Sequence, residues 1–369
     1  MLHKAESLFR RQADRGAFPG GQLVVRGGGR ELLNLSLGIA RGFRGEEGEP
    51  VPVTEDTLFQ VMSTSKPLVA FSIAVLEDQG IIDVERPVAH YIPEFARQGK
   101  GEITVLEVLT HRSGVIVPRL WHEHGLWPDW DRVQEVIWDA APRYRPGTLA
   151  YHPYEFGWIL GEVVRRASGQ PLDQFLAGVL PESLGPLRLR LTEDDRTVVA
   201  HSYWLGAKRW KLGGQDMAAG FEERNNAPST LKSLVPGASM MATASALARF
   251  YEMLLAGGAT SDGARLVRSE VLERYLTANV SGFDPMLRSF LVVGRGFLLG
   301  WRGPHPYGWW DSRACVGHGG GLCTVVFGDR RIGAAIAMVT NGNRSLWDVQ
   351  RRFAPLSSAI RRELAASSL

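Results

Sequence analysis

Ser63 and Lys66, a serine and a lysine three residues apart, are the side chains of this sequence best suited to covalent chemistry. Pro67 follows them, and since proline fits only the first turn of a helix, Ser63 is expected at or just before a helix N-terminus. Residues 68–76 are apolar on nearly every side, which predicts a buried helix that ends at Gly80. Side chains at i and i+3 share a helix face, so the hydroxyl and the amine can touch.

The chemistry expected of this pair is activation of a serine nucleophile by a neutral amine. Burial, together with the positive end of the helix dipole, disfavours the ammonium form of Lys66, so its amine can accept the Ser63 proton near pH 7. The same spacing recurs at Ser229 and Lys232, but Pro236 follows too closely for a long buried helix. From these residues alone, a helix-capping serine beside a solvated lysine stays open as the alternative interpretation.

The composition is that of a globular protein and argues against several function classes. The chain has 369 residues, of which 44% are hydrophobic, so it can bury a large core in one to three domains. Its net charge of +3 comes from scattered arginines, and we therefore expect no nucleic-acid partner and no membrane contact. Residues 1–18 contain no apolar run, which argues against a signal peptide or an anchor and favours a cytoplasmic location.

Strand-like segments occur at both ends of the chain. Near the N-terminus, residues 22–26 and 32–37 flank Gly27-Gly28-Gly29, which is a hairpin signal. Near the C-terminus, residues 314–327 and 332–339 are expected to form two further strands. The outermost segments, residues 5–13 and 346–364, carry apolar residues at helical spacing. The sequence therefore predicts one antiparallel sheet with terminal helices against it, an α+β fold of the α/β/α sandwich type.

The strand expected at 314–327 contains both cysteines of the chain, Cys315 and Cys323. In one extended strand they would lie about 26 Å apart, which is too far for a disulfide. We therefore expect two free thiols.

Helical periodicity dominates the middle of the chain, from about residue 81 to 185. The segment 192–235 lacks clear periodicity, and so long an irregular stretch in a compact enzyme is typical of a lid or a pocket wall. We therefore divide the chain into a sandwich domain of residues 1–75 and 236–369 and a mostly helical domain of residues 76–235. A pocket is expected in the cleft between the two.

Several motifs accompany the Ser63 segment in a fixed order. They are Ser63-Thr64-Ser65-Lys66 after Thr57-Leu58-Phe59, Val105-Leu106-Glu107-Val108-Leu109-Thr110-His111-Arg112-Ser113-Gly114, Pro146-Gly147-Thr148 leading to Tyr151, Pro236-Gly237-Ala238-Ser239-Met240, His318-Gly319-Gly320-Gly321 and Val339-Thr340-Asn341-Gly342. On these motifs, from residue 54 to about 341, the chain resembles the serine β-lactamase and penicillin-binding fold. It is particularly similar to the class C β-lactamases and their esterase relatives, the family VIII carboxylesterases. The resemblance implies a β-lactamase-like fold, in which the helical domain is an insert.

The resemblance also implies catalytic roles. Ser63 would be the nucleophile and Lys66 its partner, in agreement with the argument from the helix start. Tyr151 matches the family's catalytic tyrosine, whose phenolate, stabilised by the Lys66 ammonium, takes the serine proton. A core tyrosine with a bonded hydroxyl is the alternative interpretation of Tyr151, and Tyr154 is the nearest rival for its role.

The glycine-rich segment that begins at His318 takes the place of the family's Lys-Thr-Gly strand. There the main-chain amide of Gly321, with that of Ser63, would form the oxyanion hole. His318 stands where the family has its lysine, and with Gly319 and Gly320 it would contact the substrate. A structural hydrogen bond is the alternative role of His318.

Two departures from the family pattern favour esters over β-lactams. The β-lactamases place an asparagine two residues after the tyrosine, and here that substrate-facing position is Pro153, which donates nothing to an amide. The threonine of Lys-Thr-Gly is Gly319, so a hydroxyl for a substrate carboxylate is missing as well. An ester needs little more than a nucleophile, a base and an oxyanion hole.

Three tryptophans precede the glycine-rich strand closely enough to line an acyl pocket, with core packing as the equal alternative: Trp301, Trp309 and Trp310. No Gly-x-Ser-x-Gly motif occurs, which argues against an α/β-hydrolase. The His122-Glu123-His124 segment has no further paired ligand, so a solvated loop is expected there, with no metal and no cofactor.

The sequence thus predicts a carboxylesterase, a serine hydrolase that cleaves short-chain esters through an acyl-Ser63 intermediate. An acyltransferase that passes the acyl group to an alcohol or amine is the alternative, because pocket access decides the acceptor. A β-lactamase, a D-amino peptidase and a non-enzymatic scaffold of the same fold are further alternatives. The expected partner is a small ester molecule, and the sequence leaves the oligomeric state open.

Overall fold

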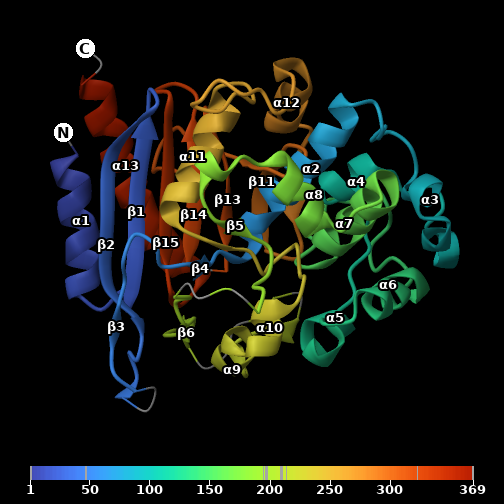
Figure 1. Cartoon of the computed structure of the whole chain (residues 1–369), viewed down its shortest axis with the longest axis horizontal. Coiled ribbons are helices and arrows are strands. Elements are labelled where there is room, and N and C mark those ends of the chain that lie inside the picture. The colour runs from blue at the N-terminus through green and yellow to red at the C-terminus, as the bar shows by residue number, and fades with distance from the viewer. Residues whose placement is uncertain are drawn as a thin grey trace.

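The computed structural model describes residues 2–45, 48–193, 195, 198–207, 211–212, 214–321 and 323–367. Its centre is a nine-stranded sheet in the order β10-β11-β12-β13-β14-β15-β1-β2-β3, in which every neighbouring pair is antiparallel (Figure 1). The strands are β1 (Gly20–Gly27), β2 (Arg30–Arg41), β3 (Val51–Pro52), β10 (Val280–Asp284), β11 (Ser289–Val293), β12 (Leu298–Leu299), β13 (Cys315–Gly320), β14 (Thr324–Asp329) and β15 (Ala334–Thr340). Because β1 pairs with β15, the two ends of the chain share one sheet, which confirms the prediction.

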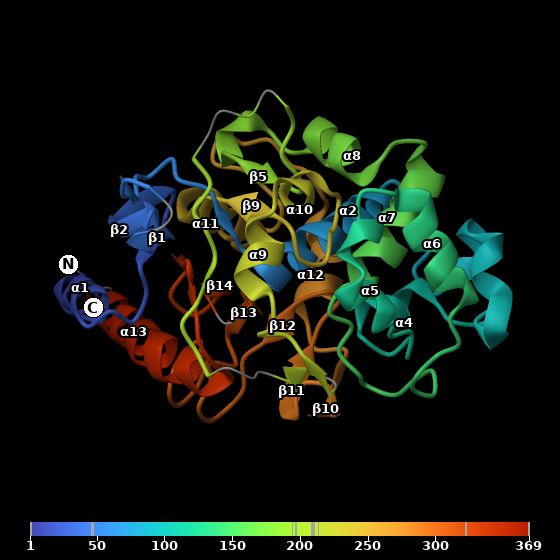
Figure 2. The same ribbon diagram turned by 90° about the horizontal axis from the view of Figure 1, so that it is seen from below.

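Helices cover both faces of this sheet. They are α1 (His3–Asp14) and α13 (Leu346–Ser367), which lie side by side on one face, and α11 (Ala244–Leu255) on the other (Figure 2). Leu23 and Val25 of β1 join the core under α1 and α13, whereas Val24 joins the core under α11. Successive side chains of a strand alternate between its faces, so a strand with apolar residues at every position is buried on both sides. The α+β sandwich predicted from the sequence is thereby confirmed.

A mostly helical region lies beside the sheet, to its right in Figure 1. Its helices are α2 (Lys66–Asp78), α3 (Val88–Tyr91), α4 (Val105–Leu109), α5 (Arg119–His122), α6 (Trp130–Asp139), α7 (Glu155–Ser168) and α8 (Leu172–Val179). A later helix, α12 (Ser269–Leu276), packs on α2. The 3-10 segments are η2 (Met62–Ser65), η3 (Pro93–Gly99), η4 (His124–Leu126) and η5 (Glu182–Leu184). Helix α2 is buried from Lys66 to Leu76, as its apolar sequence predicts. No helix of the described residues is long and apolar enough to cross a membrane.

The segment 192–235, predicted to be lid-like, is described except for residues 194, 196–197, 208–210 and 213. It forms the short elements β6 (Tyr203–Trp204), β7 (Lys211–Leu212), β8 (Gln215–Asp216), α9 (Phe221–Asn226) and α10 (Pro228–Lys232). Strand β6 pairs with β16 (Gly342–Asn343). The strands that flank the segment, β5 (Leu187–Arg188) and β9 (Met241–Ala242), pair with each other. Strand β9 also pairs with β4 (Phe59–Gln60). These pairings tie the segment to the end of the chain and to the stretch just before Ser63.

The single strand predicted at 314–327 is wrong, because the chain forms a hairpin there. Strand β13 ends at Gly320, whose carbonyl accepts the main-chain N–H of Cys323 at 2.9 Å in the turn that leads to β14. Gly321 has φ +49°, a left-handed conformation that favours glycine and interrupts the extended run. Cys315 and Cys323 are free, as predicted, although Cys315 lies in β13 and Cys323 in the turn. Both are buried.

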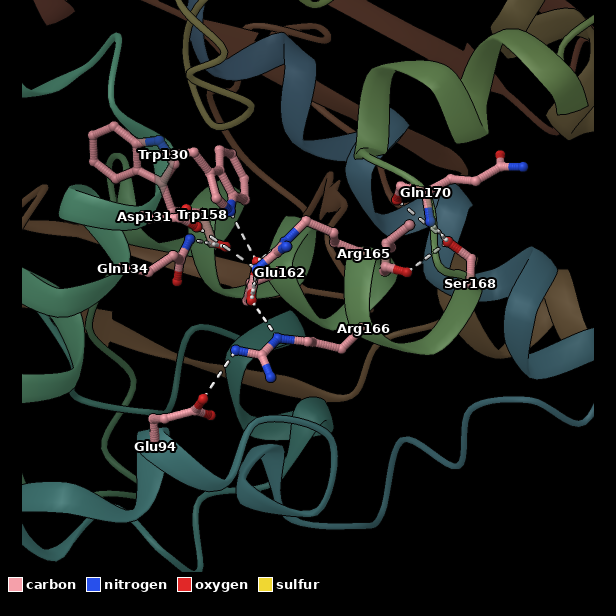
Figure 3. A network of polar contacts seen from close by, with 11 residues as sticks. Glu94, Trp130, Asp131, Gln134, Trp158, Glu162, Arg165, Arg166, Ser168 and Gln170 are labelled. Carbon is pink, nitrogen blue, oxygen red and sulfur yellow. Dashed lines mark hydrogen bonds and ion pairs between the residues drawn. The ribbon is translucent and has the colours of Figure 1, made fainter.

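A polar network joins α7 to α6 and to the 3-10 segment η3 (Figure 3). At its centre the fully buried Glu162 carboxylate accepts hydrogen bonds from Trp130 Nε1 at 2.8 Å and from Arg165 and Arg166 at 2.7 Å. Arg166 also donates to Glu94 at 3.0 Å. Burial by itself raises the pKa of Glu162, yet these donors together hold it below its ordinary value. The carboxylate is therefore ionised and anchors α7.

Replacing Glu162 by glutamine should lower the free energy of unfolding by roughly 1–3 kcal/mol at pH 7, because two arginines and an indole lose a charged acceptor. The pKa of Glu162 is lower in the folded chain than its ordinary value of 4.5. Its stabilising contribution is therefore present above the unfolded pKa and is lost as the pH falls through the folded value. Urea unfolding at pH 7 and at pH 4 should show a smaller difference between the native chain and Glu162→Gln at the lower pH.

A matched control is Glu135→Gln on α6, which removes a salt bridge to Arg132 whose two side chains are both 52% exposed. An exposed pair of this kind contributes less than about 0.5 kcal/mol. Equal effects of the two substitutions would contradict the anchoring role of Glu162.

Candidate active site

Lys66 is the first residue of α2 and is completely buried. Its Nζ donates hydrogen bonds to three oxygens, Ser63 Oγ at 3.1 Å, the Pro153 carbonyl at 2.7 Å and the Gly237 carbonyl at 2.8 Å. Ser63 lies just before it in the 3-10 segment η2, where the proline at position 67 predicts it. An ammonium has three N–H donors, so the buried charge is fully hydrogen-bonded.

The same three contacts make a neutral Lys66 a base for Ser63. A neutral amine has two N–H donors and one lone pair, and the carbonyls of Pro153 and Gly237 take up the two donors. The lone pair is then directed at the Ser63 hydroxyl. Burial lowers the pKa of Lys66 to about 7, with the Glu155 carboxylate acting in the opposite direction. The neutral amine is therefore well populated at neutral pH.

The end of β13 lies directly on the turn that carries Ser63, and only glycines permit this contact. A Cβ atom on Gly320 would lie 2.0 Å from the Val61 carbonyl oxygen, and one on Gly321 would lie 2.3 Å from Met62 Cγ. Met62, one residue before Ser63, has φ +48°, a left-handed conformation that is strained for a residue with a side chain. Ser63 and Gly321, the residues predicted for the oxyanion hole, line the same cavity.

Gly319 differs from these two glycines because its position has room for a side chain. A Cβ atom there would meet only the Thr324 carbonyl oxygen, at the ordinary contact distance of 3.7 Å. Packing therefore does not exclude a residue with a hydroxyl at this position. Gly319, Gly320 and Pro153 all line the cavity beside Ser63.

Tyr151 packs its ring against Lys66, with Nζ 5.0 Å from the ring centroid. Its main-chain N–H donates to Asp284 Oδ2 at 2.5 Å, which fixes the residue against β10. Burial raises the pKa of Tyr151, and the neighbouring Ser63 side chain opposes this only in part. The hydroxyl is therefore protonated in the free protein, in contrast to the phenolate that the family resemblance implies. Lys66, and not Tyr151, has a pKa near neutrality.

Tyr154, the rival of Tyr151, belongs to an aromatic cluster. Its ring centroid lies 5.9 Å from that of Trp158 in a stacked arrangement and 5.6 Å from that of Trp127. It lines the cavity, but within the described structure its hydroxyl makes no hydrogen bond to Ser63 or Lys66. The geometry therefore favours Tyr151 as the tyrosine next to the reacting pair.

Two buried histidines behind Tyr151, His111 and His152, have no role assigned from the sequence. The main-chain N–H of His152 donates to His111 Nδ1 at 3.2 Å, so this nitrogen is an acceptor. His152 Nδ1, also 3.2 Å from it, is then a donor, and His152 Nε2 accepts from the Ser113 hydroxyl at 3.0 Å. Burial lowers the pKa of His152 to about 3 and that of His111 well below 6.5, so both rings are neutral. The His111 and Tyr151 ring centroids lie 4.6 Å apart, so the pair supports the tyrosine.

His318 brings a neutral group to the place of the family's lysine. Its Nδ1 donates to the Gly319 carbonyl at 2.6 Å. Burial and the charge of Lys66 lower the pKa of His318 to about 3. Its Nε2 is buried and has no partner among the described residues, and the side chain lines the cavity. The site thus presents a hydrogen-bond acceptor there instead of a cation.

Ser63 opens into a cavity of about 340 Å³ with a mostly apolar wall. Of the three tryptophans proposed for an acyl pocket, Trp301 lines this cavity, and Trp309 and Trp310 do not. The main-chain N–H of Trp309 donates to the Ser358 hydroxyl on α13 at 3.0 Å, and Trp310 is 78% exposed. The wall also includes residues of the segment 192–235, as predicted for a pocket wall, namely Leu212, Met217, Phe221 and Arg224. No sequence pattern signals the further wall residues Leu291, Leu298, His305 and Tyr307.

Within the described residues, no group of histidine, cysteine, aspartate or glutamate side chains is arranged to hold a metal ion. In the His122-Glu123-His124 segment, Glu123 accepts from Arg119 at 2.8 Å, and His124 Nε2 lies 2.7 Å from the Trp121 carbonyl oxygen. Both side chains are thus engaged by α5, the helix just before them.

Comparison with known proteins matches nearly the whole chain. The model of the family described as Beta-lactamase matches residues 5–358. The esterase/beta-lactamase LipL of Mycobacterium tuberculosis is 29% identical over 347 residues, which cover 88% of this chain and 77% of LipL.

Solved structures share the fold over a similar extent. A penicillin-binding protein homolog from Caulobacter crescentus has a TM-score of 0.83 at 26% identity, covering 98% of this chain and 97% of the other. A family VIII carboxylesterase has a TM-score of 0.82 at 24% identity, covering 96% and 97%. The shared fold therefore includes both the sheet and the helical region that enclose Ser63.

The rate at which a fluorophosphonate modifies Ser63 should rise with pH, with an apparent pKa of about 7, because only the neutral amine of Lys66 can accept the serine proton. Below this pKa the ammonium predominates, and the rate should fall about tenfold per pH unit. Well above it the rate should be constant. Intact-protein mass spectrometry of the adduct between pH 5 and pH 9 measures this profile.

Three variants control the experiment. Lys66→Arg should react slowly and show no step near pH 7, because a guanidinium keeps its proton. Ser63→Ala should remove the adduct, and Ser229→Ala should retain it. A native rate that does not change between pH 6 and pH 8 would exclude Lys66 as the base.

Proposed function

The chain belongs to the beta-lactamase family and is a serine hydrolase of it, and from this premise we propose that it is a carboxylesterase that acts through an acyl-Ser63 intermediate. The observation that carries the proposal is the Lys66 amine, whose N–H bonds are held by two main-chain carbonyls while its lone pair faces Ser63. The name of its relative LipL, an esterase/beta-lactamase, includes this activity and supports the proposal.

In the acylation step, Ser63 Oγ attacks the ester carbonyl carbon while its proton passes to Lys66. The main-chain N–H groups of Ser63 and Gly321 donate to the oxygen that becomes negative. This role of Gly321 is supported by the close contact of its main chain with Met62, next to the nucleophile. The C–O bond to the alcohol then breaks, and the alcohol leaves with the proton that Lys66 returns.

Deacylation repeats the same steps with water as the nucleophile. Lys66 accepts a proton from water as it attacks the acyl-Ser63 carbonyl, and Ser63 recovers a proton when the acid departs. Tyr151 is protonated at the start, so it is suited to relay a proton between Lys66 and the oxygen of the leaving or attacking group. In this scheme the lysine is the base and the tyrosine is the relay.

The cavity wall supports esters over β-lactams as substrates. Pro153 has no N–H or side-chain donor for a substrate amide, and Gly319 has no hydroxyl for a carboxylate next to a lactam ring. A simple acyl ester presents neither group and can fill the apolar wall. Loss of two hydrogen-bond partners lowers transition-state stabilisation for a β-lactam by roughly 2–6 kcal/mol.

We therefore expect kcat/KM for 4-nitrophenyl butyrate to exceed that for the cephalosporin nitrocefin by about 10² or more. Both values are measured on one preparation, with Ser63→Ala expected to be inactive on both substrates and Ser229→Ala expected to be active. Cleavage of nitrocefin as fast as the best ester would contradict the proposed substrate class. Failure to cleave any ester would refute the esterase assignment.

Tyr151→Phe should lower kcat for the ester by about 10² or more, because the hydroxyl that relays the proton is lost while the ring stays on Lys66. Tyr154→Phe removes a hydroxyl of the same wall and is the matched control, with a smaller expected loss. Circular dichroism should show that both variants are folded. If Tyr154→Phe lost more activity than Tyr151→Phe, the relay would have to be assigned to Tyr154.

A further inference from the structure

The described wall of the cavity carries one formal charge, the guanidinium of Arg224, and no carboxylate. The wall histidines His305 and His318 are neutral, because burial lowers their pKa values to about 3. Lys66 lies directly behind Ser63 and adds a partial positive charge near pH 7. A cavity with cations and no anion attracts negatively charged ligands.

Arg224 belongs to α9, within the segment whose irregular sequence predicts a pocket wall. Its terminal nitrogens donate to the carbonyls of Met217 at 3.1 Å and Ala219 at 3.2 Å, and its Cζ lies 5.8 Å from the Phe221 ring centroid. Its Nε is buried and has no partner among the described residues. A guanidinium has five N–H donors, so three of them are not used by the described part of the chain.

Two acidic residues directly precede Arg224 in the sequence. Glu223 is exposed and forms no ion pair with Arg224 in the described structure, and Glu222 binds elsewhere. Glu222, on the same helix, accepts from Arg44 at 3.0 Å and from the main-chain N–H of Trp204 at 2.9 Å. Burial raises the pKa of Tyr154, a residue of the cavity wall, and the charge of Arg224 acts against this rise. The positive charge of Arg224 is therefore felt at the cavity wall. The described residues supply no carboxylate that neutralises this charge.

We propose that Arg224 binds a carboxylate of the substrate, so that the preferred substrates are esters that carry a carboxylate besides the ester group. The inference rests on the esterase activity proposed above and adds the chemical class of the substrate. The parallel N–H donors of a guanidinium match the two oxygens of a carboxylate. A neutral ester can fill the apolar wall but leaves this cation without a counter-ion.

Two matched pairs of esters test the inference and distinguish the acid part from the alcohol part. Mono-4-nitrophenyl glutarate and 4-nitrophenyl pentanoate differ in a carboxylate on the acyl group. The anion of 4-acetoxybenzoic acid and its methyl ester differ in a carboxylate on the leaving group. In at least one pair, kcat/KM of the native enzyme should be about tenfold higher for the anionic ester.

Variants then assign the preference to Arg224. Arg224→Gln should reduce the ratio of the two kcat/KM values about tenfold, and Arg224→Lys should retain part of it. The matched control is Arg44→Gln, which removes a contact to the same helix from a residue that is not part of the cavity wall, and it should leave the ratio unchanged.

The outcomes separate this inference from the proposed function. Equal or faster cleavage of the neutral ester in both pairs, or a ratio that Arg224→Gln does not change, overturns the inference and leaves the esterase intact. Failure to cleave all four esters overturns the proposed function itself. If Arg224→Gln does not fold, the native enzyme decides, because added salt should screen the attraction and lower the ratio. A ratio that is independent of salt then overturns the inference.

Discussion

The buried amine of Lys66 is the group on which the rest of the structure depends. Removing an ammonium from water is strongly unfavourable unless hydrogen bonds replace the lost hydration. Here the replacement comes from Ser63 Oγ and from the carbonyls of Pro153 and Gly237, which belong to three separate stretches of the chain. The fold must hold all three stretches within reach of one nitrogen, and the proposed reactivity of Ser63 depends on that arrangement.

Glycines on two sides of the site make the arrangement possible. A Cβ atom on Gly157 would lie 2.0 Å from the main-chain nitrogen of Gly237, so α7 can approach the loop that supplies a carbonyl only without a side chain there. On the other side, Gly320 and Gly321 let the end of β13 touch the turn that carries Ser63. The helical region and the sheet therefore meet beside Ser63 through main-chain contacts, which do not take up the space of the cavity.

Sequence patterns predict the candidate reacting side chains better than the atoms that position them. Ser63 and Lys66 follow from local spacing before a buried helix, and the shared sheet follows from apolar runs at both chain ends. The carbonyl acceptors of Lys66 give no such signal, because every residue has a carbonyl and only the fold decides where it points. The turn between β13 and β14 lies inside one apolar, glycine-rich run, so periodicity merges the two strands. His111 and His152 are 41 residues apart, and Arg224 lies in a segment without periodicity, so their contacts become visible only in the folded chain.

The histidines around Lys66 can form hydrogen bonds without adding charge. His111, His152 and His318 are neutral because burial lowers their pKa values, and the charge of Lys66 lowers them further. This influence is mutual, so a protonated imidazole at any of these positions would drive the pKa of Lys66 below 7. The buried Glu155 carboxylate acts in the opposite direction and raises it. With the histidines neutral, the pKa of Lys66 is a balance between its own burial and one carboxylate. The proposed transfer of a proton from Ser63 to this amine and back requires such a balance.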